Sequence, residues 1–286
     1  MDNLKAKKRH PEEIAVYTAI YVCAAFSVLL LLGIIIYVFA KGARRVNWAF
    51  LTGVTSILHG TVGIAGNILN TLIIILLTMI ITTPIGVGAA IYLNEYAKPG
   101  KLVTVIIFAT ETLAGIPSII FGLFGMLFFG QLCHMGYSLL TGSLTLTLMV
   151  LPLVTRNTQE ALKTVPDSFR TGAVGLGAGK WYTIRTILLP SAMPGIVTGV
   201  ILAIGRIIGE SAALLFTAGS AHLLPKTFDA FLEKIFHSGG TLTIQLYLSA
   251  SKGEFEVAFG IAVVLLVIVL LINFGTKRLA KKLEKR

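Results

Sequence analysis

Long apolar runs dominate this chain and predict helices that cross a membrane. Residues 14–40 form a run of 27 residues without a charged side chain or a histidine. Residues 186–205 and 257–276 each form a further run of 20 residues of the same kind. A helix needs about 20 predominantly apolar residues to cross the hydrocarbon core of a bilayer. Each of the three runs is therefore long enough for a transmembrane helix.

Two other stretches are almost free of charge. Residues 46–94 and 112–155 each contain one histidine and no charged side chain. The second stretch is too long for one helix, and its polar segment Gln131–Tyr137 is the natural place for it to fold back. The whole pattern predicts six transmembrane helices, at Ile14–Ala40, Ile68–Leu93, Leu102–Phe129, Leu139–Thr155, Ile187–Phe216 and Glu256–Phe274.

The composition agrees with a membrane protein. Apolar residues make up 55% of the chain and charged residues 13%, about half the share usual in soluble domains. Backbone polar groups in lipid must be satisfied within the structure, so only helices or a closed barrel can span the membrane. Runs this long without a two-residue alternation exclude the barrel. We therefore predict an all-α integral membrane protein with one transmembrane domain over residues 1–286.

The net charge of +11 would suggest nucleic-acid binding in a soluble protein, but its distribution indicates membrane topology. If the N-terminus is cytoplasmic, the inside segments hold 17 Lys and Arg residues and the outside segments hold 6. The positive-inside rule then predicts that both termini lie in the cytoplasm. The basic start followed by an apolar run resembles a signal peptide, but the run is too long, so we interpret it as an uncleaved helix.

The segment between the fourth and fifth predicted helices has the pattern of two short helices. A Thr-Val-Pro-Asp sequence ending at Asp167 is a helix-start signature. Phe169, Ala173 and Leu176 follow at spacings of four and three residues, so they are expected on one apolar face. An apolar stripe on a short helix outside the membrane predicts docking in the groove of a partner protein. The alternative is a loop that lies among lipid headgroups.

Glycines are expected to end the first of these helices. A second short helix, Lys180–Leu189, follows them and is expected to end at Pro190. The stretch Gly175–Lys180 does not fit a nucleotide-binding P-loop, because only three residues separate its outer glycines and Trp181 follows the lysine. We find no catalytic set and no metal-ligand spacing, so no enzyme activity is predicted for this chain.

The spacing of this segment resembles the cytoplasmic signature of ABC importer permeases, Glu-Ala-Ala, three residues, Gly, nine residues and Ile-x-Leu-Pro. Gly177 is followed by nine residues and then by Ile187–Pro190, and Ala173 closes the triplet. Thr171 and Gly172 stand where the family has Glu and Ala. The resemblance implies that residues 156–186 form a coupling loop for an ATPase. Its expected contact residues are Phe169, Thr171, Gly172, Ala173, Leu176 and Gly177.

Further segments resemble phosphate-import permeases in particular, so that the likeness covers about residues 65–275. They are Leu113–Phe124, Thr164–Arg170, Leu189–Ile196, Gly205–Glu210 and Ala213–Ala218. Leu214–Ala218 is similar to the PstA type of subunit rather than to its PstC-type partner. The resemblance implies a type I ABC importer permease (MetI-like) fold in a prokaryotic cell membrane. It also implies three kinds of partner: a PstC-type permease, two PstB-type ATPases that bind ATP and Mg, and a PstS-type phosphate-binding protein outside the cell.

Four charged residues in or near the predicted spans are candidates for the substrate path. Arg206 and Glu210 are four residues apart and would share a helix face as an ion pair. Charged groups at this depth are costly and commonly functional. The fork of an arginine suits phosphate, which could displace Glu210 from Arg206. A structural pair between helices is the alternative.

The other two candidates are Arg156 and Glu111. The family associates an arginine near Arg156 with the path, although a topology anchor at the membrane surface is equally compatible with the sequence. Glu111 should face protein rather than lipid, either in the path or in a helix–helix hydrogen bond. Glycine pairs at 195/199 and 205/209 predict close helix packing around Arg206.

Other functions stay open at this point. The same type of permease could carry another oxyanion, such as sulfate, molybdate or a phosphonate. A secondary transporter is a further alternative, but it would be expected to show inverted repeats, and we recognise none.

Overall fold

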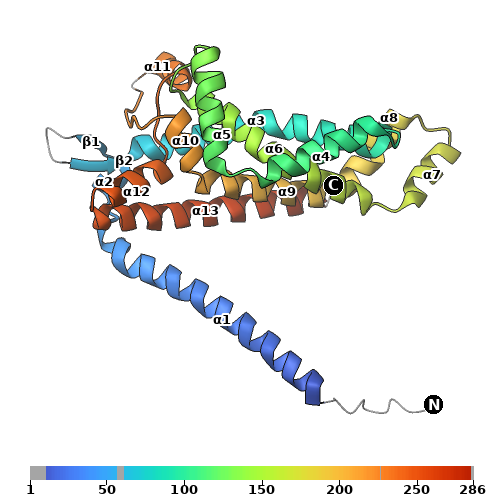
Figure 1. Ribbon diagram of the computed structural model, residues 1–286, viewed down its shortest axis with the longest axis horizontal. Coiled ribbons are helices and arrows are strands. Elements are labelled where there is room, and N and C mark those ends of the chain that lie inside the picture. The colour runs from blue at the N-terminus through green and yellow to red at the C-terminus, as the bar shows by residue number, and fades with distance from the viewer. Residues whose placement is uncertain (1–10, 57–60, 226, 285–286) are drawn as a thin grey trace.

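A computed structural model describes residues 11–56, 61–225 and 227–284 (Figure 1). The basic residues Lys5, Lys7, Lys8 and Arg9, on which part of the topology prediction rests, lie outside this range. Within it, five helical stretches are long and apolar enough to cross a membrane, and a bent pair of helices makes a sixth if it counts as one span. The prediction of an all-α membrane protein with about six spans is therefore confirmed.

Four long helices run side by side along the body of the molecule (Figure 1). They are α3 (Ala65–Ile91), α6 (Leu139–Lys163), α9 (Leu189–Gly209) and α13 (Phe255–Glu284). Helix α6 packs against both α3 and α9, and α13 packs against α9. Their shared core contains residues such as Ile74, Leu146, Met149 and Ile207, which are almost fully buried.

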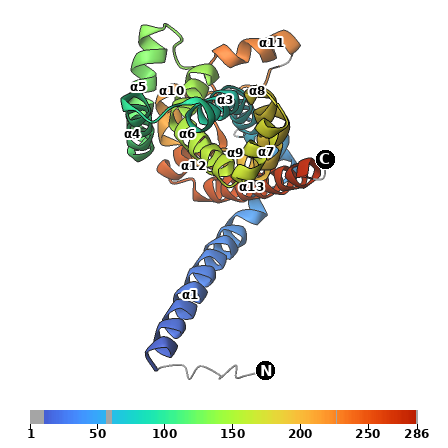
Figure 2. The same ribbon diagram turned by 90° about the vertical axis from the view of Figure 1, so that its right-hand side faces the viewer.

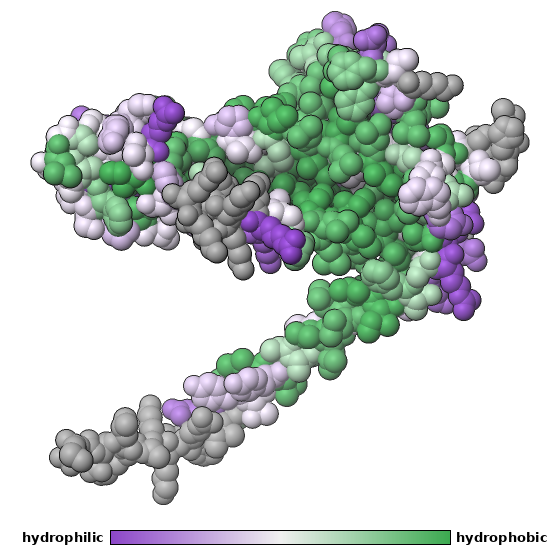
Figure 3. Space-filling model, turned by 180° about the vertical axis from the view of Figure 1, so that it is seen from behind, coloured by the Kyte–Doolittle hydropathy of each residue, from purple (hydrophilic) through white to green (hydrophobic). Residues whose placement is uncertain are grey.

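Helix α1 (Pro11–Gly42) stands apart from this body in both ribbon views (Figures 1 and 2). It approaches α13 at its C-terminal end, where Gly42 is so close that an added Cβ would lie 2.2 Å from the carbonyl oxygen of Phe259. The most apolar part of α1 is 0% buried within this chain. Figure 3 shows a largely apolar surface along α1 and over the body. This surface needs lipid or another subunit to cover it.

The third predicted helix, Leu102–Phe129, is wrong as a single straight helix. Helix α4 (Lys101–Gly115) and helix α5 (Ser118–Gly125), which continues as the π-helical segment η3 (Met126–Leu132), meet at an angle of 103°. Pro117 lies at the bend. A proline removes a backbone donor and disfavours the helical conformation in the residue before it, here the extended Ile116. The helix therefore breaks completely at this point.

The fifth predicted helix differs at both ends. Pro190 does not end a helix, because α8 (Lys180–Thr183), the π-helical turn η4 (Ile184–Leu188) and α9 form one stretch of 30 residues. The break comes instead after Gly209, and the short helix α10 (Ala212–Thr217) follows.

Several ends and loops also differ from the predictions. Helices α6 and α13 continue beyond their apolar runs, since helix ends depend on capping and local propensity rather than on the lipid boundary. The segment before α3 contains strands that the apolar pattern did not predict: Thr61–Ile64 forms strand β2, paired antiparallel with β1 (Val54–Ser56), and α3 begins at Ala65. The segments missed altogether are α2 (Trp48–Thr52), α11 (Phe228–Glu233) and α12 (Leu242–Ser251).

Buried side-chain hydrogen bonds fix the long loop after α10 to the start of α3. The amide of Asn67 donates to the carbonyl of Gly240 at 2.9 Å. Asn70 donates to the same carbonyl and to that of Ala221, each at 3.0 Å. The hydroxyl of Thr71 accepts from the backbone of Leu242 at 3.0 Å. All three side chains on α3 are buried, so this end of the molecule is held together by polar contacts that are largely shielded from water.

Candidate docking helix and substrate path

Helix α7 (Asp167–Gly175) protrudes at the end of the body opposite the β-hairpin (Figure 1). It ends in a Schellman motif, in which Gly177 donates to the carbonyl of Val174 and Ala178 donates to that of Ala173, both at 2.9 Å. Gly177 has a φ of +81°, a conformation that favours glycine. The predicted helix start and glycine end are confirmed, but the segment between spans begins at Thr164, because residues 156–163 still belong to α6.

The expected apolar face of α7 is only partly correct. Phe169 is 47% exposed, whereas Ala173 is 5% exposed and packs against the chain's own core. Leu176 lies beyond the last helical turn, as the C-terminal cap, and is 91% exposed. Three further apolar side chains at this end are exposed and were not predicted from the sequence, namely Val174, Trp181 and Tyr182.

Thr171 and Gly172, which stand where the signature has Glu and Ala, are both exposed on α7. The Thr171 hydroxyl donates to the carbonyl of Asp167 at 3.2 Å, and no atom lies within 4 Å of a Cβ built on Gly172. This surface of α7 is therefore open to a partner protein.

Arg170 holds α7 to the body, a role that was not predicted from the sequence. Its guanidinium lies against the carboxylate of Glu95 in the π-helical turn η2 (Tyr92–Tyr96), which continues α3. The shortest N–O distance in this ion pair is 2.8 Å. The hydrogen bond to Glu95 raises the pKa of Arg170, although burial opposes this effect. The pair joins residues 75 positions apart, so no local pattern could have revealed it.

Two of the candidate path residues meet in one cavity between α4 and α6. Glu111 and Arg156 both line this space of about 190 Å³. Arg156 also forms an exposed ion pair with Glu160, one turn further along α6, at 3.2 Å. Glu160 lines the cavity as well, and the remaining lining residues are Leu93, Ile107, Thr110, Gln159 and Lys163. Charges of both signs thus surround a cavity that is large enough for a small hydrated ion.

The expected ion pair between Arg206 and Glu210 is wrong, because α9 ends between them. Glu210 is extended, and its carboxylate accepts from the backbone N–H of Ala213 at 3.1 Å, which caps α10. Its carbonyl accepts from the hydroxyl of Thr243 at 2.7 Å. Arg206 is exposed, and it makes no hydrogen bond or ion pair with the residues that the structure describes. Its guanidinium is therefore free to meet an anion or a second subunit.

The two glycine pairs around Arg206 have different surroundings. A Cβ on Gly195 would lie 2.5 Å from the Cβ of Ala161, and one on Gly199 would lie 2.6 Å from that of Asn157. This first pair therefore allows the close contact of α9 with α6. Gly205 and Gly209 have no neighbouring atom within 4 Å of such a Cβ, so the second pair lies on an open face.

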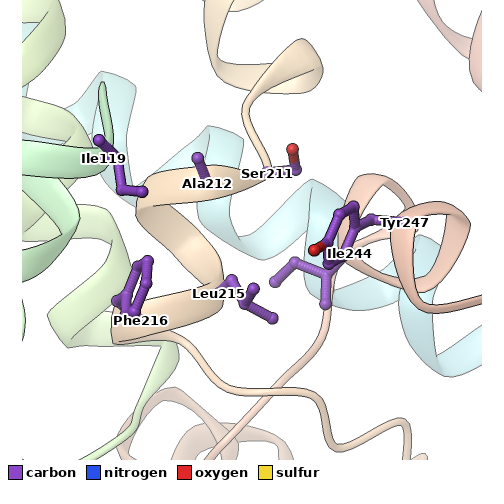
Figure 4. A pocket seen from close by; sticks show the side chains of 7 residues that line it. All are labelled: Ile119, Ser211, Ala212, Leu215, Phe216, Ile244 and Tyr247. Carbon is purple, nitrogen blue, oxygen red and sulfur yellow. The ribbon is translucent and has the colours of Figure 1, made fainter. Parts of the chain in front are cut away.

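An apolar cavity of about 200 Å³ lies beside the break between α9 and α10 (Figure 4). It is bounded by Ile119 of α5, by α10, and by Ile244 and Tyr247 of α12. Ser211 and Tyr247 supply its polar groups, and no charged side chain lines it. An oxyanion would find no cation there, so the cavity is not an anion site on its own.

Comparison with known proteins gives the family. A model of the inner membrane component of binding-protein-dependent transport systems matches residues 82–286. A probable ABC transporter permease protein of Bacillus subtilis, YqgI, is 35% identical over 92% of this chain and 93% of its own length. The phosphate transport system permease protein PstA of Xylella fastidiosa is 34% identical over 84% of this chain and 82% of its own length.

Solved structures agree in fold. A bacterial alginate ABC transporter has a TM-score of 0.71 at 14% identity, with 96% of both chains covered. The inward-facing methionine transporter MetNI has a TM-score of 0.58 at 21% identity and covers 77% of this chain and 94% of its own. Identities this low show the fold alone. The family match shows that the chain belongs to the inner membrane components of binding-protein-dependent transport systems. With the shared fold, it shows that the chain is a permease subunit of an ABC importer.

Proposed function

We propose that this chain is one of two permease subunits of an ATP-driven importer of inorganic phosphate. The observation that carries the proposal is the likeness to relatives named PstA, one of which is 34% identical over 84% of this chain. The relative YqgI carries no substrate in its name, so the substrate rests on the PstA relatives and on the chemistry of the site residues.

The charged residues near the spans support an oxyanion as substrate. An arginine is costly inside a membrane unless it faces water or protein, and Arg206 has no partner among the described residues. A guanidinium offers two parallel donors to phosphate. Arg156 and Glu111 share a polar cavity elsewhere, between α4 and α6. A carboxylate can accept a hydrogen bond from a protonated phosphate oxygen, whereas sulfate carries no proton at neutral pH, so Glu111 and Glu210 would favour phosphate.

The other subunits of the transporter follow from this proposal. Helix α7 and both chain termini face the cytoplasm, where two ATPase subunits similar to PstB bind ATP and Mg. A second permease similar to PstC covers the open face of α9, and a binding protein similar to PstS delivers phosphate from outside. This chain supplies the path and the docking surface and needs no cofactor of its own.

The proposal predicts ATP-dependent phosphate uptake. Proteoliposomes that contain the assembled complex, enclosed ATP and external binding protein should accumulate labelled phosphate, and a tenfold excess of sulfate should leave this uptake unchanged. Liposomes without ATP are the control. Uptake of sulfate, molybdate or a phosphonate in place of phosphate would contradict the substrate, and uptake without any ATPase would support a secondary transporter.

Replacing Leu176 by aspartate is expected to reduce the amount of ATPase that co-purifies with the permease by about tenfold. Burial of one leucine side chain contributes about 1.5–3 kcal/mol, and Leu176 is 91% exposed in the free chain. Leu176 is the C-terminal cap of α7, where a carboxylate is unfavourable by about 0.3–1 kcal/mol, less than the expected loss from the leucine contact. The matched control is Leu223→Asp, at a leucine that is 71% exposed far from α7. Equal recovery of ATPase with both variants would contradict the docking role.

A further inference from the structure

Arg170 makes more polar contacts than any other side chain of α7. Its Nη2 and Nε atoms donate to the Glu95 carboxylate, with the shortest contact at 2.8 Å. Nη1 donates to the carbonyl of Val165 and Nη2 to that of Leu162, both at 3.0 Å. Nη1 also reaches the carboxylate of Asp167 at 3.0 Å. One guanidinium thus joins α7, the C-terminal end of α6 and the end of α3.

The contact with Glu95 is the sheltered one of the two ion pairs. The side chain of Glu95 is 8% exposed and that of Arg170 is 23% exposed, whereas the side chain of Asp167 is 92% exposed. Exposed ion pairs contribute little, but breaking a sheltered pair leaves a charge without its partner. The energetic link therefore runs from α7 to Glu95 and not to Asp167.

The turn that holds Glu95 has an unusual geometry. Residues Tyr92–Tyr96 form a π-helical turn, a form that is rare and often found at functional sites. Lys180, at the start of α8, lies with its Nζ atom 4.8 Å from the centroid of the Tyr96 ring. Helix α7, through Arg170, and helix α8, through Lys180, are therefore both attached to this one turn.

The same turn leads directly to the bent pair of helices. Only residues 97–100 separate η2 from α4, and α4 continues through the bend into α5. Helix α4 carries Glu111, which lines the polar cavity with Arg156. A displacement of Glu95 would thus reach α4 through a connection of four residues.

We propose that the Glu95–Arg170 pair is the link through which movement of α7 reaches α3 and the α4–α5 pair during the transport cycle. Arg170 and Glu95 act as positioning residues that do not touch the substrate. The pair transmits movement from the ATPase contact to the substrate path. This inference rests on the proposed docking role of α7. Loss of the pair would leave α7 on the ATPase but release α3, so ATP would be hydrolysed without transport.

The test compares transport with hydrolysis in the assembled complex. Glu95→Gln and Arg170→Lys are each expected to lower the number of phosphate ions taken up per ATP hydrolysed about tenfold, within the usual range for coupling between sites. ATP hydrolysis stimulated by the loaded binding protein should stay within about twofold of the unaltered complex. Glutamine keeps the shape of Glu95 without its charge, and lysine keeps the charge of Arg170 without its fork.

Asp167→Asn is the matched control, because it removes the exposed ion pair of the same guanidinium and should leave the ratio unchanged. If a single variant fails to assemble because one charge is left unpaired, the double variant Glu95→Gln/Arg170→Gln removes both charges and should assemble. Uptake and hydrolysis that fall in proportion would overturn the inference, since the pair would then only build the docking surface. An unchanged ratio in the assembled variants would overturn it as well.

A second measurement does not depend on the substrate. In a background without Cys23 and Cys133, spin labels at Val174 of α7 and at Leu132, the end of η3, report the distance between these elements. ATP binding should change this distance in the unaltered complex and not in Glu95→Gln; the same change in both would contradict the link. A complex that shows this behaviour but moves no phosphate would contradict the proposed substrate and leave the link supported.

Discussion

Replacing Arg206 by glutamine is expected to abolish most phosphate uptake while leaving the complex assembled. Truncating one partner of a desolvated, hydrogen-bonded charge pair costs about 2–5 kcal/mol, which corresponds to a loss of about 30-fold or more. Arg206 makes no contact with Glu210, whose carboxylate caps α10, so the guanidinium is available to an anion without displacing a partner. The measurement is the initial rate of ATP-dependent phosphate uptake in proteoliposomes.

One further variant separates charge from geometry in this prediction, and another is the control. Arg206→Lys keeps the positive charge but loses the fork, so its uptake should fall between those of the unaltered chain and Arg206→Gln. Arg278→Gln is the control, because Arg278 is exposed on α13 and its guanidinium lies over the ring of Phe274 at 4.1 Å. Full uptake by Arg206→Gln would exclude Arg206 from the path.

The spans could be predicted from the sequence because lipid imposes a simple length and polarity requirement on them. The breaks were harder, because proline acts according to its position. Pro117 lies where two helices meet and separates them. Pro190 lies directly after the π-helical turn η4, within a helical stretch that continues from Lys180 to Gly209. The break after Gly209 depends on the cap that Glu210 provides for α10, which is not visible in apolar patterning.

The candidate site could be predicted only where it is local in sequence. The spacing of the signature located α7 and its glycine end, since a helix and its cap lie within a few residues of each other. The partner of Arg170 could not be predicted, because Glu95 is 75 residues away and looks like an ordinary turn residue. The pairing of Arg206 with Glu210 failed for the opposite reason: a spacing of four residues implies contact only while the helix continues.

Replacing Gly66 by alanine is expected to prevent stable folding of this chain. Gly66 lies in the first turn of α3, and a Cβ there would lie 1.8 Å from the carbonyl oxygen of His222. A side chain could rotate away, but this neighbour is backbone. The flanking loop cannot yield either, because Asn67 and Asn70 hold the carbonyls of Ala221 and Gly240 through buried hydrogen bonds.

The clash therefore has to break buried polar contacts, each of which costs about 1–3 kcal/mol when left unsatisfied. Gly88→Ala is the matched control in the same helix, because no atom lies within 4 Å of a Cβ at that position. It should be neutral or stabilise the helix by about 0.5–1 kcal/mol. Size-exclusion chromatography and thermal unfolding of the detergent-solubilised complex give the measurement. Gly66→Ala that purifies and melts like the unaltered chain would mean that the loop after α10 is free to move away from α3.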